Sequence, residues 1–167
     1  MPPFMAPIRT LFPAAVLMCC VSSSCATIGG ISLRPDGSPG PEPCPEKALE
    51  AMRKLGLSVG DSSIVELDVN QANTSPITMY DGPVESMLLD PLGNIPGVTR
   101  LYGRVWTGGP QVVIRYYEMH VPDEEPVPIC AVARLARGQL KKKPESLPGT
   151  GILEFSKAAL YIVNSFR

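Results

Sequence analysis

Short apolar runs recur along the last two thirds of the chain and are separated by turn residues. Within these runs, apolar residues alternate with polar ones or are rich in β-branched side chains. This pattern is typical of β-strands with a buried face. We expect strands over residues 64–69, 77–80, 84–89, 99–107, 111–121, 127–135, 150–156 and 160–166. The turn pair Asp81 and Gly82 predicts a hairpin between the second and third of these strands.

One earlier segment, residues 45–56, has the periodicity of a helix. It begins with proline and glutamate, ends with basic residues and is followed by glycine, which are start and stop signals of a helix. Ala48, Leu49, Met52 and Leu55 fall on one face, so we expect the helix to pack on a sheet with its other side in water. The pattern predicts a mainly β (α+β) fold, a small antiparallel β-barrel or sandwich with one N-terminal helix.

The start of the chain has the order of regions found in an export signal. The first ten residues carry one base, Arg9, and no acid, and residues 11–21 are mostly apolar but too short to span a membrane, which takes roughly 20 residues. Ser24 followed by Cys25 resembles the lipobox cleaved by the bacterial lipoprotein signal peptidase. We expect residues 1–24 to be a lipoprotein signal peptide and Cys25 to carry lipid, palmitate included; a cleaved signal without lipid is the alternative.

The residues around the expected cleavage site predict where the protein resides. Ala26 stands where lipoproteins kept in the inner membrane have aspartate, so we expect an envelope location in the outer membrane, facing the periplasm or the cell surface. Residues 25–43 are rich in glycine and proline with almost no apolar periodicity, which predicts a flexible linker. Residues 44–167 are then the folded β domain.

The cysteines agree with export. Two of the five lie in the expected signal peptide and one would be lipidated, which leaves Cys44 and Cys130. Two cysteines in an exported chain suggest one disulfide, which would close a loop of about 85 residues and contribute roughly 4 kcal/mol. A metal site and a catalytic thiol are the rival interpretations, but two cysteines and one histidine, His120, cannot supply four good metal ligands, and Cys130 lies in an apolar run.

Charge and motifs exclude several functions. With 15 bases and 16 acids the net charge is -1, which provides no strong field for nucleic acid. No Gly-x-Ser-x-Gly elbow and no phosphate-binding loop is present, so we expect no nucleotide, no cofactor and no catalytic or metal-binding set. His120, beside Glu118, is the one candidate general base, and it supports an alternative in which the protein is an envelope hydrolase or transferase.

The strands 99–107 and 111–121 form the most distinctive predicted surface. A two-residue turn at Gly108 and Gly109 would set Trp106 opposite Gln111 and Tyr102 opposite Arg115. One face would then carry aromatic and basic groups suited to a sugar ring, a peptide or an acidic partner. This candidate binding face consists of Tyr102, Arg104, Trp106, Arg115 and Tyr117. If Pro110 joins the turn, Trp106 instead faces Val112 and belongs to the core.

Several short motifs follow one another along most of the chain after residue 43. They are Cys44-Pro45, Ala48-Leu49-Glu50-Ala51-Met52, Tyr80-Asp81-Gly82-Pro83, Ile95-Pro96-Gly97, Tyr102-Gly103-Arg104-Val105, Pro128-Ile129-Cys130 and Phe155-Ser156. In their order and spacing the chain resembles a family of small myxobacterial lipoproteins of unknown function. The resemblance implies an exported β domain whose Cys-Pro start is joined to a second cysteine, and it carries over no catalytic residues.

Many members of that family carry an automatic assignment as serine/threonine protein kinases. This chain has no Gly-x-Gly-x-x-Gly, His-Arg-Asp or Asp-Phe-Gly motif and is too short for a kinase fold. The sequence therefore favours a lipid-anchored β domain with a non-catalytic binding or structural role in the cell envelope. Its expected partners are the membrane, through Cys25, and an envelope protein or polymer.

Overall fold

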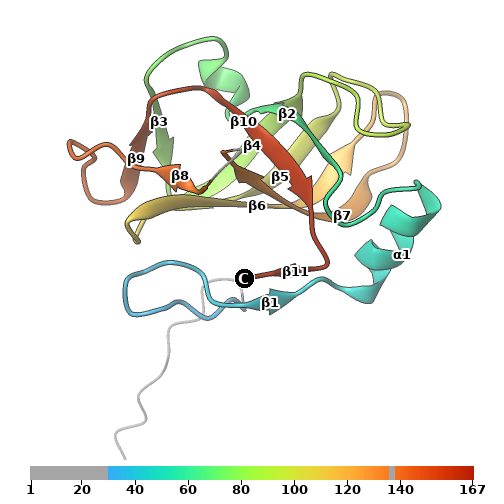
Figure 1. Ribbon diagram of the computed structural model, residues 1–167, viewed down its shortest axis with the longest axis horizontal. Helices are drawn as coiled ribbons and strands as arrows, with labels where there is room; N and C mark the ends of the chain where they lie inside the picture. Colours follow the sequence, from blue (N-terminus) through green and yellow to red (C-terminus); the bar gives the residue numbers. More distant parts are fainter. Residues whose placement is uncertain (1–29, 136–137) are drawn as a thin grey trace, which may run out of the picture.

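A computed structural model describes residues 30–135 and 138–167 (Figure 1). The predicted signal peptide and Cys25 lie outside these residues. The described elements are β1 (Glu42–Pro43), α1 (Glu46–Lys54), β2 (Ser62–Glu66), the 3-10 turn η1 (Val69–Gln71), β3 (Ile77–Tyr80), β4 (Gly82–Leu88), β5 (Arg100–Trp106), β6 (Gln111–His120), β7 (Val127–Arg134), β8 (Leu140–Lys141), β9 (Thr150–Leu153), β10 (Lys157–Ile162) and β11 (Ser165–Phe166).

Six antiparallel strands close into a barrel. Their order is β5-β4-β2-β10-β7-β6, and β6 pairs again with β5 to complete the ring. β8 pairs with the first two residues of β6. Two small sheets, β3 with β9 and β1 with β11, lie beside the barrel. The predicted mainly β fold with one early helix is confirmed, and of the two architectures expected it is the barrel.

The barrel interior is filled by alternate residues of its strands, as the period of two requires. Along β6, Val112, Ile114 and Tyr116 are buried in this way, and Arg115 points to the outer face. The Ser86 hydroxyl donates to the Leu67 carbonyl oxygen at 2.7 Å and lies 2.8 Å from the Tyr116 hydroxyl. Because the one proton of Ser86 is used, Tyr116 is the donor to Ser86.

Burial of Tyr116 predicts a loss of stability at alkaline pH. Desolvation raises the pKa of Tyr116 far above its ordinary value of 10. The stabilising neutral form is therefore fully favoured below pH 10, and its contribution is lost as the pH rises above 10, where the unfolded chain ionises first. Above pH 10 we expect the free energy of unfolding to decrease more steeply with pH in the wild type than in Tyr116→Phe. The difference between the two slopes is expected to reach about 1.4 kcal/mol per pH unit. Urea unfolding between pH 9 and 11 measures both slopes, and equal slopes would contradict the assignment.

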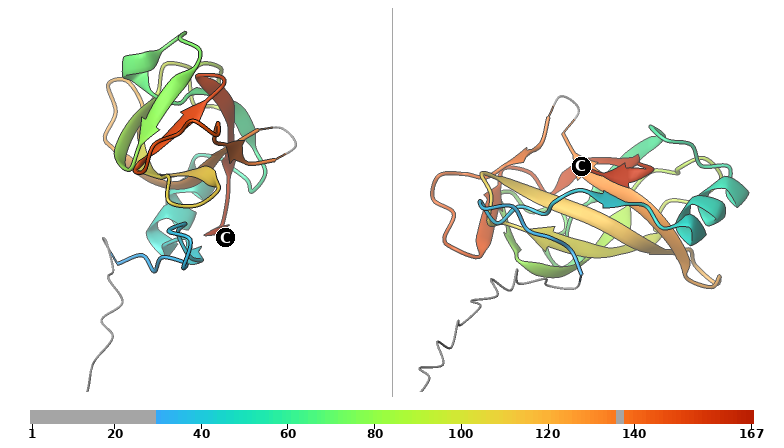
Figure 2. Two further views of the ribbon diagram at one scale, coloured as in Figure 1. Left: turned by 90° about the vertical axis from the view of Figure 1, so that its left-hand side faces the viewer. Right: turned by 90° about the horizontal axis from the view of Figure 1, so that it is seen from below.

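Helix α1 covers part of the outer face of β7 (Figures 1 and 2). Ala48 and Met52 are buried against the barrel, and the backbone N–H of Cys130 in β7 donates to the Met52 sulfur at 3.4 Å. Leu49 and Leu55 are partly buried. The face predicted from helical spacing is therefore the face that packs.

The predicted hairpin between residues 77–80 and 84–89 is wrong. β3 pairs with β9, with Ile77 opposite Leu153, and does not pair with β4. Asp81 accepts hydrogen bonds from the Thr107 backbone N–H at 2.8 Å and the Thr107 hydroxyl at 2.6 Å, and Gly82 already pairs with Val105. Asp81 and Gly82 thus form a corner between two sheets, because contacts with β5 and the loop after it outweigh the local preference for a turn.

The register of β5 and β6 also differs from both predicted registers. Trp106 lies opposite Val113 and Arg104 opposite Arg115, so four residues join the strands. An irregularity at Tyr117 then shifts the pairing so that Tyr102 faces Glu118. A Cβ on Gly103 would lie 2.1 Å from the Arg115 carbonyl oxygen, so glycine permits this close approach.

Residues 30–43, predicted as part of a flexible linker, lie along the outer face of β6 (Figures 1 and 2). Leu33 pairs with Pro39, Glu42 pairs with Phe166 of β11, and Ser38 is buried. Gly37 has a φ of 81° and packs on the turn after β5, where a Cβ would meet Gly108 Cα at 3.0 Å. The linker prediction is therefore wrong for this part, because its glycines and prolines supply turns that fit the barrel surface.

Candidate functional site

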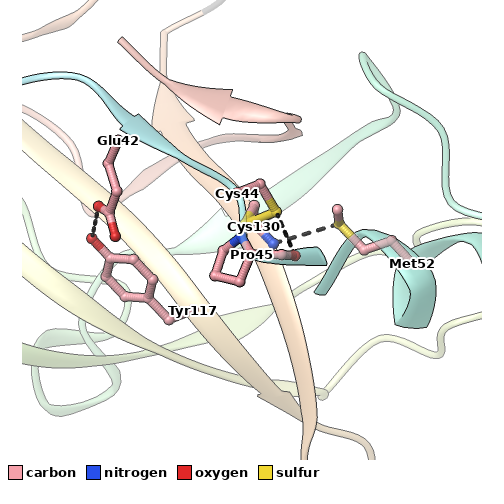
Figure 3. Close-up of a disulfide and its surroundings, with 6 residues drawn as sticks. All are labelled: Glu42, Cys44, Pro45, Met52, Tyr117 and Cys130. Carbon is pink, nitrogen blue, oxygen red and sulfur yellow. Dashed lines mark hydrogen bonds between the residues drawn. A yellow bond between two sulfur atoms is a disulfide. The ribbon is translucent and has the colours of Figure 1, made fainter. Parts of the chain in front are cut away.

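The predicted disulfide between Cys44 and Cys130 is confirmed. Its sulfurs are 2.12 Å apart and its Cα atoms 6.0 Å apart, over a sequence separation of 86 (Figure 3). Cys44 immediately precedes Pro45, which occupies the N-cap position of α1, and Cys130 lies in the middle of β7. The bond therefore attaches the end of the segment 30–43 and the start of the helix to the barrel wall.

The candidate binding face of Tyr102, Arg104, Trp106, Arg115 and Tyr117 is not an open surface. Trp106 is 4% exposed and Arg115 is 1% exposed, while the other three are half-buried. The Arg104 and Arg115 guanidinium carbons lie 5.7 and 5.5 Å from the Trp106 ring centroid. The prediction of a contact face for a partner is therefore wrong for Trp106 and Arg115, which are taken up by contacts within the chain.

Arg115 holds the segment 30–43 on the barrel. Its Nη2 donates to the Gly40 carbonyl oxygen at 2.7 Å, and its Nη1 lies 3.3 Å from Glu42 Oε2. The guanidinium carbon is also 5.0 Å from the Phe166 ring centroid. The Tyr117 hydroxyl donates to the same Glu42 oxygen at 3.0 Å (Figure 3), and burial followed by the Glu42 charge raises the pKa of Tyr117. Four of the five predicted residues thus lie in or beside this contact.

Tyr102 belongs to a second cluster, which contains the candidate base. Its ring centroid is 4.4 Å from that of His120, and its hydroxyl donates to Glu85 Oε1 at 3.2 Å. His120 Nε2 contacts Glu118 Oε1, so the two residues considered for catalysis do meet. Burial, then the Glu85 charge, raises the pKa of Tyr102. His120 and Glu118 lie on the outer strand surface, and neither lines the arginine cavity described next.

Four arginines line a cavity that the sequence did not indicate. It has a volume of about 200 Å³ and lies between residues 34–38, β6, the end of β7 and the last residue. The arginines are Arg34, Arg115, Arg134 and Arg167, with Asp36 as the acidic residue of the wall. No motif could have revealed them, because they are far apart in sequence and one of them lies in the segment predicted to be a linker.

The wall of this arginine cavity is fixed by local hydrogen bonds. The Arg34 N–H donates to the Ser38 carbonyl oxygen at 2.8 Å, and the Gly37 N–H donates to the Arg34 carbonyl oxygen at 2.9 Å. Asp36 Oδ1 accepts from the Ser38 hydroxyl at 2.6 Å and the Ser38 N–H at 2.9 Å, and the hydroxyl contact is the main cause that lowers the pKa of Asp36. Asp36 is thus hydrogen-bonded within the turn and forms no ion pair among the described residues, although the Arg34 charge also helps to lower its pKa.

Two structural features are absent among residues 30–135 and 138–167. No group of three or more histidine, cysteine, aspartate or glutamate side chains is placed to hold a metal ion. No helix in the same residues is long and apolar enough to cross a membrane.

Comparison with family models, with curated proteins and with solved structures finds no match for this chain.

Proposed function

We propose that this protein is an exported domain, anchored by lipid at Cys25 in the cell envelope, that binds an envelope component without catalysis. The observation that carries the proposal is the disulfide between Cys44 and Cys130, since such bonds persist in oxidising compartments outside the cytosol. The lipobox at Ser24 and Cys25 and the resemblance to small myxobacterial lipoproteins support the same compartment.

The binding part of the proposal is supported by the arginine cavity. Cavities with a few convergent polar groups are the usual positions of small-ligand sites. This one lies on the outer face of the barrel and has charged walls contributed by segments far apart in the sequence. The predicted aromatic face loses its role as the contact surface, because Trp106 and Arg115 are buried.

The anchor is tested by metabolic labelling with a palmitate analogue in cells that export the chain. We expect label on the wild type and none on Cys25→Ala, with Cys25→Ala released from the membrane fraction, because the thiol of Cys25 is the expected acceptor. Cys20→Ala, a matched change within the expected signal, should keep its label. Absence of label on the wild type, or label that persists in Cys25→Ala, would refute the anchor.

The contact between His120 and Glu118, beside the Tyr102 ring, favours the alternative of an envelope hydrolase or transferase. A carboxylate that orients a histidine is a common arrangement for a general base. The full-length chain is therefore assayed for hydrolysis of envelope polymers beside His120→Ala. An activity that this substitution abolishes would favour the enzyme over the binding domain.

A further inference from the structure

Three of the four arginines in the cavity form no ion pair in the described part of the chain. Arg115 is paired with Glu42, whereas no ion pair of Arg34, Arg134 or Arg167 occurs among these residues. Arg34 and Arg167 are exposed and Arg134 is half-buried. Water screens the exposed arginines, and an anion bound among them would remove the remaining repulsion between like charges.

The side chains also determine how much negative charge the cavity can accept. Arg115 and Glu42 cancel, Asp36 offsets one of the remaining three arginines, and the α-carboxylate of Arg167 offsets a second, which leaves a net charge of about +1 (3 − 2). The cavity is therefore positive and suits an anion. A phosphate monoester, with about −1.5 to −2 at pH 7, offers more acceptor oxygens to separate guanidinium groups than a single carboxylate does.

Shape and donors agree with the charge. The volume of about 200 Å³ is below the roughly 300–1,000 Å³ of sites for drug-sized ligands, and it suits a phosphate group with a short substituent. Guanidinium groups present paired N–H donors that match the oxygens of phosphate. Gln111 and Gln139 add neutral amide donors to the same wall.

The cavity has a rigid wall on the side of Arg34. Gly37 and Gly108 are in direct backbone contact, since a Cβ added to Gly108 would lie 2.9 Å from Gly37 Cα. On the opposite side, Arg134 follows Val132 by two residues in β7 and so lies on the same outer face, next to β6. The arginines therefore project from separate elements that the barrel and the turn 34–38 hold in position.

We propose that the arginine cavity binds a phosphate group, supplied either by a free phosphate or small phosphate ester or by the headgroup of a lipid. This site gives the proposed binding role its ligand class and therefore rests on that role. In the second case the ligand would belong to the same membrane that the lipid at Cys25 enters.

The test is calorimetric titration of the full-length chain, in a nonionic maltoside detergent and a buffer free of phosphate. Inorganic phosphate and glycerol 3-phosphate are the soluble ligands, and mixed micelles with phosphatidic acid or phosphatidylcholine are the lipid arm. We expect Arg34→Gln and Arg134→Gln each to weaken phosphate binding at least about tenfold, since each removes charge-assisted hydrogen bonds. Arg53→Gln removes the same charge from the exposed face of α1 and should leave the affinity unchanged.

The soluble ligands and the lipid micelles distinguish the two possible sources of the phosphate. Binding of the soluble ligands alone identifies a small phosphate compound, and stronger binding to phosphatidic acid micelles than to phosphatidylcholine micelles identifies a lipid. No binding in any arm, equal affinity for succinate and phosphate, or equal affinity of both cavity variants and the wild type would overturn the site. Labelling at Cys25 does not depend on the cavity, so these failures are distinguishable from failure of the proposed function.

Discussion

The double variant Cys44→Ala/Cys130→Ala is expected to have a free energy of unfolding about 4 kcal/mol lower than that of the wild type. The disulfide joins residues 86 apart, and cross-linking so long a loop removes much of the conformational entropy of the unfolded chain. It also attaches the start of α1 and the segment 30–43 to β7, so its loss frees several elements at once. Urea unfolding monitored by circular dichroism measures the difference.

Reduction of the wild type separates the cross-link from packing. Both cysteines are buried, Cys130 completely and Cys44 with 6% exposed, so alanine also removes buried atoms. The reduced wild type keeps these atoms. Its free energy of unfolding is still expected to be about 3–4 kcal/mol below that of the oxidised protein, because the cross-link is gone. A loss below about 1 kcal/mol in both samples would show that the bond contributes little to the fold.

Substitution Glu42→Ala is expected to lower the free energy of unfolding by about 3 kcal/mol. The Arg115 guanidinium is 1% exposed and would keep its charge without its carboxylate, which is the costly way to break a buried pair. The expected loss is at the lower end of the usual range because Glu42 is 26% exposed and Gly40 continues to accept from Arg115. Urea unfolding gives the total, and amide hydrogen exchange shows whether residues 30–43 open separately.

A double-mutant cycle with Arg115→Met isolates the interaction. The double variant has no unpaired buried charge, so its loss should be smaller than the sum of the two single losses by at least about 1 kcal/mol. Glu46→Ala is the matched control, because Glu46 and Arg53 form a pair exposed by 77% and 69% and should contribute less than about 1 kcal/mol. Additive losses, or an equal loss in Glu46→Ala, would argue against the role of Arg115.

The helix and strands with a clear side-chain periodicity lie close to where the sequence predicts them. Helix α1 and the strands β3, β5, β6 and β7 lie within one or two residues of their predicted ranges, because their side-chain periodicities are local properties. The strand predicted over 160–166 is divided into β10 and β11, and β1 and β8 were not predicted because two residues carry no period.

Two predictions, the linker over residues 30–43 and the hairpin at Asp81 and Gly82, are wrong for the same reason. The same residue types occur in different structures. Glycine and proline are frequent in flexible linkers and also in turns that pack closely, and the segment 30–43 is of the second kind because Arg115 and Gly108 offer it contacts. Likewise, Asp81 and Gly82 suit a hairpin, but Thr107 binds Asp81 and makes it a corner. Arg115 and Gly108 are far in sequence from the segment 30–43, and Thr107 is far from Asp81.

By itself the sequence determined the β class, the position of the helix and the pairing of Cys44 with Cys130. These follow from short-range periodicity and from the small number of cysteines outside the expected signal. Only the tertiary structure decided the closure of the barrel, the register of β5 and β6, the burial of Trp106 and the arginine cavity. Each of these depends on hydrogen bonds and packing between residues distant in the chain, whose free energy no local pattern encodes.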